Sequence, residues 1–319
     1  MNHHIGFIGG GNMAQAIITG LLKSDRTASD ILVSDPNPES RKAISALGVA
    51  AFDHHEPVMA QAEFMILAVK PQMMDVVLAE IAPSLRESQI VISIAAGITI
   101  GGIRRRLNAP KNTVVRVMPN TPALIGEGMS ALASDTTLDD ETKIAVQRIF
   151  ESCGQALWVP SEGAIDTVTA VSGSGPAYFF LMIENLINTG IRLGLSPDVA
   201  QKLVVQTAKG AAQMVEFSDV GPDVLRQRVT SPGGTTEAAL AVFHEGDFAD
   251  LVDRALIAAR DRAGELAVVE VPATSRGGRA PPRACAPSTG PNSAIGLAWV
   301  AARTAPPLLC LGCPPPARW

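Results

Sequence analysis

Cysteine is scarce in this sequence. Cys153 is the only cysteine before residue 285, which excludes a disulfide framework for the main body of the chain. Long apolar runs are also missing, because polar residues or glycine interrupt every candidate, so no membrane span is expected. The first residues, MNHHIGFIGGGN, lack a basic region followed by a long apolar run. We therefore expect no signal peptide.

An excess of positive charge is missing as well. The 26 lysines and arginines are outnumbered by 31 aspartates and glutamates, which gives a formal net charge of -5 and a pI near 5.6. This balance argues against a nucleic-acid partner and against an anionic membrane surface. Apolar residues, by contrast, make up 47% of the 319 residues, enough for a sizeable core in one large domain or two. We expect a soluble, cytoplasmic protein.

The first part of the chain alternates short apolar strands with amphipathic helices. Strands are expected at 5–8, 31–33, 64–69, 90–94, 114–117 and 156–159. Helices are expected at 13–22, 38–47, 73–85 and 139–153. Such alternation is typical of parallel strands joined by crossover helices. The prediction for residues 1–161 is an α/β domain with a doubly wound parallel sheet.

From about residue 163 the strand signals disappear. Helices are expected at 176–193, 197–217, 222–229, 236–245 and 248–266. The segment AYFFLMIENLI is apolar almost all round, which predicts that its helix is buried, within the chain or in a subunit interface. Residues 162–267 are therefore expected to form an all-helical domain.

The composition changes abruptly at about residue 268. The rest of the chain is rich in proline, arginine, cysteine and glycine, and Glu270 is the only acid after Glu265. Such a sequence cannot sustain a packed helix. We expect residues 268–319 to be an aberrant, disordered tail, and we favour a shift of reading frame over a natural extension as its origin.

The segment IGFIGGGNMAQAI places a strand, a glycine-rich turn and a helix in succession. Gly9, Gly11 and Ala14 have the spacing G-x-G-x-x-A. In dinucleotide-binding loops the first glycine permits the tight turn, the second lets the backbone approach a diphosphate, and the third position packs helix against strand. The helix N-terminus then offers N–H groups to the anion. The predicted cofactor-binding residues here are Gly9, Gly10, Gly11, Asn12, Met13 and Ala14.

The second strand is followed by SDPNPESRK, where the adenosine ribose of a dinucleotide is expected. Asp35 is placed to bind the 2′-hydroxyl of NAD. Ser34, Asn37 and Arg41 offer partners to the 2′-phosphate of NADP instead. The basic pair Arg41 and Lys42 is explained equally well as a solvated helix start. These residues do not decide whether the chain prefers NADH or NADPH.

Three further segments follow strand ends, where ligands of open α/β sheets bind. They are AVKP, SIAAG and VMPNTPA. Lys70 precedes Pro71 and is therefore expected to be extended rather than helical. A role in binding the cofactor and an ordinary exposed lysine explain Lys70 equally well. The predicted cofactor-binding residues at these ends are Ala68, Val69, Lys70, Pro71, Ala95, Ala96, Gly97 and Asn120.

Two segments of the second half, AVSGSGPAYFF and TSPGGTT, each precede a predicted helix. Both have an ordinary interpretation as turns and helix caps, with proline early in the first helix of the pair. Adjacent glycines before a helix also form a nest of backbone N–H groups that binds carboxylate. Taken separately, the segments do not decide between cap and site.

Taken together and in order, GFIGGGNMA, AVKP, SIAAG, MPNTPA, AVSGSGPAY and SPGGTT resemble the pyrroline-5-carboxylate reductase family over about residues 3–267. SGSGPAY and SPGGTT carry the specificity, because many dehydrogenases share the glycine loop. The resemblance implies a Rossmann domain followed by an all-helical dimerisation domain, with homodimers that assemble into decamers. It implies reduction of 1-pyrroline-5-carboxylate to L-proline, with NADPH as the expected cofactor and NADH as the alternative.

The resemblance also implies roles for the second segment. Ser231 and the backbone of Gly234 and Thr235 would hold the substrate carboxylate, Thr236 would hydrogen-bond the ring nitrogen, and Ser174 would bind substrate as well. TSPGGTT contains no acid. Reduction of a carbonyl requires a positioned acid, whereas an imine that is already protonated accepts hydride without one. No metal is predicted.

Two other functions remain open. A β-hydroxyacid dehydrogenase shares the glycine loop and a helical second domain, but that family pairs a lysine with an asparagine four residues later. Here Lys202 and Lys209 are followed at that distance by Gln206 and Gln213. A non-catalytic nucleotide-sensing protein would have no reason to keep both SGSGPAY and SPGGTT.

Overall fold

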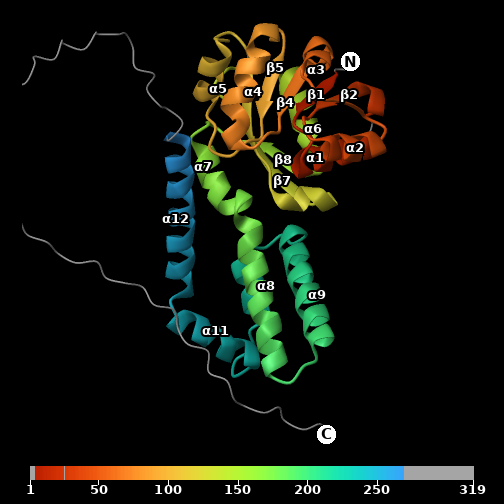
Figure 1. Cartoon of the computed structure of the whole chain (residues 1–319). Coiled ribbons are helices and arrows are strands. Elements are labelled where there is room, and N and C mark those ends of the chain that lie inside the picture. Colours follow the sequence, from red (N-terminus) through yellow and green to blue (C-terminus); the bar gives the residue numbers. More distant parts are fainter. Residues whose placement is uncertain (1–3, 25, 269–319) are drawn as a thin grey trace, which may run out of the picture. The chain divides into compact units, whose positions relative to one another are not determined.

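The computed structural model describes residues 4–24 and 26–268, so residues 269–319 of the predicted tail lie outside the described part. An α/β part is followed by an all-helical part (Figure 1), which confirms the predicted fold class. The strands are β1 Ile5–Ile8, β2 Ile31–Ser34, β3 Ala50–Phe52, β4 Phe64–Leu67, β5 Ile90–Ser93, β6 Val114–Met118, β7 Gly128–Ser134 and β8 Gly154–Trp158.

All of these strands belong to one sheet, in the order β3-β2-β1-β4-β5-β6-β7-β8. β1 lies between β2 and β4, with Ile5 opposite Ile31 on one side and Phe64 on the other. The order from β3 to β6 is parallel throughout and is that of a doubly wound dinucleotide-binding sheet. β7 runs antiparallel to β6, and β8 runs parallel to β7. The sheet is therefore mixed at this edge, which the sequence did not predict.

Helices cover both faces of the sheet (Figure 1). Successive strand side chains point to opposite faces, so a strand that is apolar throughout supplies two cores. Phe7 and Ile66 join the core formed with α1 and α6, whereas Met65 and Leu67 join the core formed with α4 and α5. The helices of this part are α1 Asn12–Lys23, α2 Pro38–Ala46, α3 Glu56–Gln61, α4 Met74–Ile81, α5 Ile100–Leu107 and α6 Asp140–Glu151.

Two strands and two helices of this part were not predicted. β3 is only three residues long, and β7, GMSALAS, consists mostly of small residues with weak strand preference. α3 is a single short helix, and α5, IGGIRRRL, contains two adjacent glycines that disfavour a helix. α5 nevertheless buries Ile100, Ile103 and Leu107 completely or nearly so. Packing against the sheet, rather than local preference, decides these elements.

The helical part contains α7 Ala164–Val168, α8 Gly175–Arg192, α9 Pro197–Glu216, α10 Pro222–Arg228, α11 Thr235–Glu245 and α12 Phe248–Val268. Predicted and observed ends of the last five agree within two residues. A π-helical turn, Thr169–Gly173, joins α7 to α8. SGSG therefore lies inside a nearly continuous helical segment, where the sequence predicted a turn before a helix.

Large apolar side chains of the helical part are exposed in the single chain. Gly175 is the buried residue of α8 and Ala200 that of α9. Phe179 is 71% exposed, Phe180 is 62% exposed and Phe217 is 79% exposed. The prediction that AYFFLMIENLI is buried is therefore wrong for one chain, and its place in a subunit interface stays a prediction. Within the described residues, no helix has both the length and the apolarity that crossing a membrane requires.

Candidate functional site

A cleft of about 750 Å³ opens where β1, β2 and β4 end. All of its lining residues lie between Gly9 and Ser84 in the sequence. This is the edge of a doubly wound sheet at which ligands bind. The structure brings together here the predicted cofactor residues Gly9, Gly11, Ser34, Asp35, Ala68, Val69 and Lys70.

The glycine loop has the geometry that a bound diphosphate needs. Gly9 adopts a φ of 101°, and a Cβ on it would lie 2.7 Å from the carbonyl oxygen of Ala68. Gly11 precedes α1 without a side-chain cap, and a Cβ on it would meet nothing within 4 Å. Asn12 and Met13 begin the helix, and Ala14 is buried against the core. The open space and N–H groups at this helix end fit the diphosphate of a dinucleotide.

Alanine at the two glycines is expected to separate folding from binding. Gly9→Ala should destabilise the fold by about 2 kcal/mol or more, because the positive φ and the contact with Ala68 both penalise a Cβ. Gly11→Ala should leave the free energy of unfolding within about 0.5 kcal/mol but weaken dinucleotide binding about tenfold or more, since the Cβ occupies the diphosphate's path. Urea denaturation and nucleotide titration measure the two effects. Unchanged binding by Gly11→Ala would contradict the assignment.

The carboxylate of Asp35 holds the glycine loop against β2. Its Oδ2 accepts a hydrogen bond from Gly10 N–H at 2.8 Å, and its Oδ1 accepts one from Asn37 N–H at 2.8 Å. Arg41, a predicted phosphate partner, donates from Nη1 to the backbone carbonyls of Asp35 and Pro36, both at 2.8 Å. Arg41 is not among the residues that line the cleft. In this structure it stabilises the turn after β2.

Two cleft residues, His55 and Glu80, were missed from the sequence. Ser34 is fully buried at the end of β2, and its hydroxyl lies 2.8 Å from Nδ1 of His55. Nε2 of His55 lies 3.1 Å from Oε2 of Glu80, which is carried by α4. His55 follows β3, and the three residues of β3 are too few to show the sequence pattern of a strand. No signal in the sequence could therefore place this imidazole beside β2.

The AVKP segment leaves β4 in the conformation expected of it. Lys70 is extended, with φ -62° and ψ 144°, and Pro71 begins a 3-10 turn. Ala68 N–H still donates to the carbonyl of Ile8 at 2.8 Å, so the segment stays beside β1. Ala68, Val69 and Lys70 line the cleft, whereas Pro71 does not.

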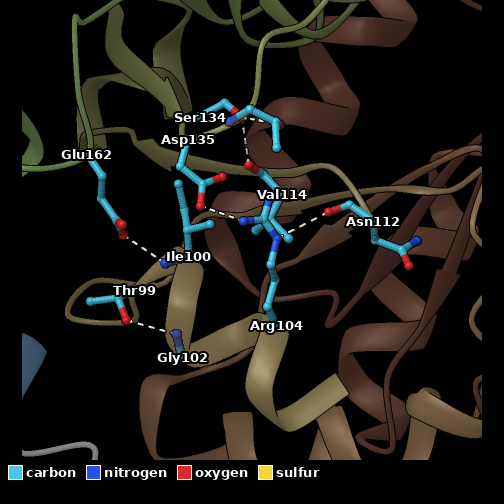
Figure 2. Close-up of polar contacts among 10 residues, drawn as sticks. Thr99, Ile100, Gly102, Arg104, Asn112, Val114, Ser134, Asp135 and Glu162 are labelled. Carbon is cyan, nitrogen blue, oxygen red and sulfur yellow. Dashed lines mark hydrogen bonds and ion pairs between the residues drawn. The ribbon is translucent and has the colours of Figure 1, made fainter. Parts of the chain in front are cut away.

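Ala95, Ala96 and Gly97 connect β5 to α5 and do not line the cleft. Gly97 has a φ of 77°. The helix that follows is capped at its N-terminus by two side chains, as Figure 2 shows. Thr99 Oγ1 accepts the N–H of Gly102 at 3.0 Å, and Glu162 Oε1 accepts the N–H of Ile100 at 2.7 Å. A carboxylate of the protein itself therefore neutralises this helix end.

Glu162 also belongs to a cluster of two partly exposed carboxylates around a buried arginine. Arg116, 3% exposed on β6, places Nη1 3.3 Å from Oε1 of Glu162 and Nη2 3.5 Å from Oδ1 of Asp166. Asp166 lies in α7, so the cluster ties the sheet to the first helix of the second part. A buried charge keeps such partners because desolvation without them is costly.

Removing Glu162 should therefore destabilise the protein. Glu162→Ala leaves Arg116 with one carboxylate and removes one of the two caps of α5, and we expect a loss of about 2–4 kcal/mol in the free energy of unfolding. Asp135→Asn is the matched control, because Asp135 pairs with Arg104 at the surface of the same region (Figure 2). It should cost less than about 1 kcal/mol. Equal midpoints in urea denaturation would contradict the role of the cluster.

Asn120 contacts the second part of the chain. Its Nδ2 donates to the backbone carbonyl of Ser172 at 3.2 Å, and its Oδ1 accepts Met129 N–H at 2.9 Å. Asn120 does not line the cleft. Its amide instead connects the end of β6 to the SGSG segment, within which Ser174 precedes α8 without a side-chain cap bond.

The TSPGGTT segment forms a tight turn before α11. Gly233 has a φ of 70°, and Gly234 N–H donates to the carbonyl of Ser231 at 2.9 Å. Gly233 N–H donates to the carboxylate of Glu237 at 2.7 Å. Thr236 is half-buried and Thr235 exposed. The turn thus binds the carboxylate of the chain's own Glu237, and none of its residues lines the cleft.

Other reactive groups are poorly placed for chemistry. Burial raises the pKa of the Cys153 thiol to about 11, which leaves almost no thiolate near neutral pH. Among residues 4–24 and 26–268, no group of three or more histidine, cysteine, aspartate and glutamate side chains is placed to hold a metal ion.

Comparison with known proteins decides the family. Residues 162–266 match the family model described as pyrroline-5-carboxylate reductase dimerisation, and residues 4–97 match one described as NADP oxidoreductase, coenzyme F420-dependent. A pyrroline-5-carboxylate reductase of Pseudomonas aeruginosa is 44% identical over 264 residues, which cover 82% of this chain and 96% of the relative. This chain belongs to the pyrroline-5-carboxylate reductase family.

Other members confirm that assignment in sequence and in structure. The pyrroline-5-carboxylate reductase of Pisum sativum is 34% identical, covering 83% of this chain and 96% of the relative. A solved reductase of Coxiella burnetii matches with a TM-score of 0.80 at 37% identity, over 83% of this chain and 99% of the other. The reductase of Plasmodium falciparum, solved with NADP bound, matches with a TM-score of 0.75 at 32% identity, over 83% and 98%. The chain is an oxidoreductase of this family, which decides against the hydroxyacid dehydrogenase and the non-catalytic sensor.

Proposed function

We propose that this chain reduces 1-pyrroline-5-carboxylate to L-proline, the last step of proline biosynthesis, with hydride from a nicotinamide dinucleotide. One observation carries the proposal. A cleft at Gly9 and Gly11, at the sheet edge where dinucleotides bind, and a turn whose Gly233 N–H donates to the Glu237 carboxylate occur in one chain of the reductase family. When bound, the dinucleotide supplies the hydride.

The TSPGGTT turn is proposed to hold the substrate. The hydroxyl of Ser231 and the backbone of Gly234 and Thr235 would bind the carboxylate, helped by the N-terminus of α11, which has no side-chain cap. Thr236 would hydrogen-bond the ring nitrogen, and Ser174 would bind the substrate from the start of α8. The bond from Gly233 N–H to the chain's own Glu237 carboxylate supports this only in that a backbone N–H of the turn is directed at a carboxylate.

The proposed reaction does not require a general acid from the protein. A protonated C=N bond accepts hydride without a further proton, and TSPGGTT supplies hydroxyl and N–H groups rather than an acid. The chain's contribution is to fix the ring nitrogen and the carboxylate so that one face of the ring meets the cofactor. Orientation of this kind accounts for a large part of enzymatic rate enhancement.

Self-association follows from the dimerisation domain and its exposed apolar side chains. We propose that the assembly is a homodimer, with decamers of such dimers as the higher state. All residues that line the cleft lie between Gly9 and Ser84, so Thr236 is not part of this lining. We propose that the dimer completes the site by bringing Thr236 to the cleft. A cytoplasmic location remains a prediction. The resemblance favours NADPH over NADH, and the charges that line the cleft bear on this choice.

A spectrophotometric assay tests the proposed function. Purified protein is mixed with 1-pyrroline-5-carboxylate and either reduced nucleotide, and the decrease in nicotinamide absorbance is followed. Turnover that requires the pyrroline and yields L-proline supports the proposal. A protein that binds reduced nucleotide, is dimeric and shows no turnover with either nucleotide would overturn it.

A further inference from the structure

The wall of the cleft beyond the end of β2 carries an excess of negative charge. Among the described residues that line it, Lys70 is the one lysine or arginine. The carboxylates in the same lining are Asp35, Asp53, Glu56 and Glu80. These come from the ends of β2 and β3 and from α3 and α4, so the adenosine end of a dinucleotide would meet acids on more than one side.

The imidazole side chains of His54 and His55 in this wall each lie within hydrogen-bond distance of a carboxylate. His54 Nδ1 lies 2.6 Å from Oδ1 of Asp53, and His55 Nε2 lies 3.1 Å from Oε2 of Glu80. The bond with His54 lowers the pKa of Asp53, so that this acid stays ionised. The other nitrogen of His55 faces the hydroxyl of Ser34 at 2.8 Å. Neither ring presents both nitrogens to a ligand.

The nearest arginine does not restore the balance. Arg41 directs Nη1 to the carbonyls of Asp35 and Pro36 and does not line the cleft. Even if its charge is counted with that of Lys70, two positive side chains stand against four carboxylates. A 2′-phosphate brings up to two further negative charges to this place, whereas a 2′-hydroxyl brings none.

We propose that the cleft discriminates against a 2′-phosphate, so that NADH binds more tightly than NADPH. The carboxylates of Asp35 and Glu80 set the ratio of the two dissociation constants. The inference rests on the proposed cofactor role of this cleft. It differs from the NADPH preference expected from the resemblance, for which Ser34, Asn37 and Arg41 were the possible phosphate partners; Arg41 does not line the cleft. Asp35 also offers the carboxylate that binds a ribose hydroxyl in NAD sites. A unit charge about 8 Å away in water changes the affinity for a phosphate dianion about fivefold.

The test is the dissociation constant of each reduced nucleotide, measured without substrate by nicotinamide fluorescence at pH 8. In the unmodified protein, NADPH should bind about fivefold or more weakly than NADH. Glu80→Gln should move that ratio about two- to fivefold toward NADPH. Glu87→Gln is the matched control, because Glu87 is exposed and lies outside the cleft, beside Lys111. It should leave the ratio unchanged, and the effect of Glu80→Gln should shrink at high salt.

Three results would overturn the inference. NADPH binding as tightly as NADH in the unmodified protein would contradict the selectivity, while the proposed function would stand. A selective loss of NADPH affinity in Arg41→Gln would show that this arginine binds the phosphate. Failure of both nucleotides to bind would refute the cofactor role of the cleft and with it the proposed function.

Discussion

Replacing Phe179 and Phe180 together by aspartate is expected to yield a monomer with turnover at least about a hundredfold lower. The two rings are 71% and 62% exposed in one chain, and burying such a ring in an interface contributes about 1.5–3 kcal/mol. In a symmetric dimer each substitution counts twice, so the lost burial alone exceeds about 6 kcal/mol. Carboxylates at the same positions add a desolvation cost. The dimer's dissociation constant should rise by more than about four orders of magnitude.

Sedimentation and light scattering measure the assembly, and the spectrophotometric assay measures turnover. Ile144→Asp is the matched control, because Ile144 is 51% exposed on α6 in the first part of the chain. That variant should keep both the assembly and the activity. Nucleotide binding by the double variant should persist, because the cleft lining lies wholly in the first part of the chain. A stable dimer formed by the Phe179 and Phe180 variant would contradict the proposed interface.

Thr236→Val is expected to lower turnover about ten- to a hundredfold while nucleotide affinity stays the same. Valine keeps the shape of threonine and removes the hydroxyl that would orient the ring nitrogen. One hydrogen bond in a closed site is worth about 1–3 kcal/mol, which corresponds to that range of rates. The fold should lose about 1 kcal/mol at most, because Thr236 lies in the first turn of α11, where a hydroxyl contributes little beyond capping.

Thr235→Val provides the control for this prediction. Thr235 precedes Thr236 in the same turn of α11, but its proposed contribution to substrate binding is the backbone N–H, which valine retains. Turnover should therefore change less than about threefold, well below the effect of one lost hydrogen bond. If Thr236→Val turned over substrate as fast as the unmodified chain, Thr236 would have no part in the mechanism. The turn would then serve only as a carboxylate site.

Much of the fold and part of the candidate site could be predicted from the sequence, because they depend on local patterns. The spacing of Gly9, Gly11 and Ala14 predicts a loop whose positive φ and open helix end follow from the glycines themselves. Apolar runs predict β1, β2, β4, β5 and β6, since strands buried on both faces are apolar throughout. Proline in the first helical turn marks α8, α9 and α10. The motif set SGSGPAY and SPGGTT predicts the family, which the comparisons confirm.

The rest was decided by which segments lie side by side in space. β7 is a strand because β6 and β8 flank it, and α5 is a helix because it buries one face and is capped by Glu162, 62 residues away. His55 meets Ser34 only because β3 pairs with β2. Arg41 turns to carbonyls that no spacing rule would assign to it. Sequence determined the local conformations and the family, whereas the charge lining the cleft depended on the tertiary structure, because electrostatic and hydrogen-bond partners are set by distance in space.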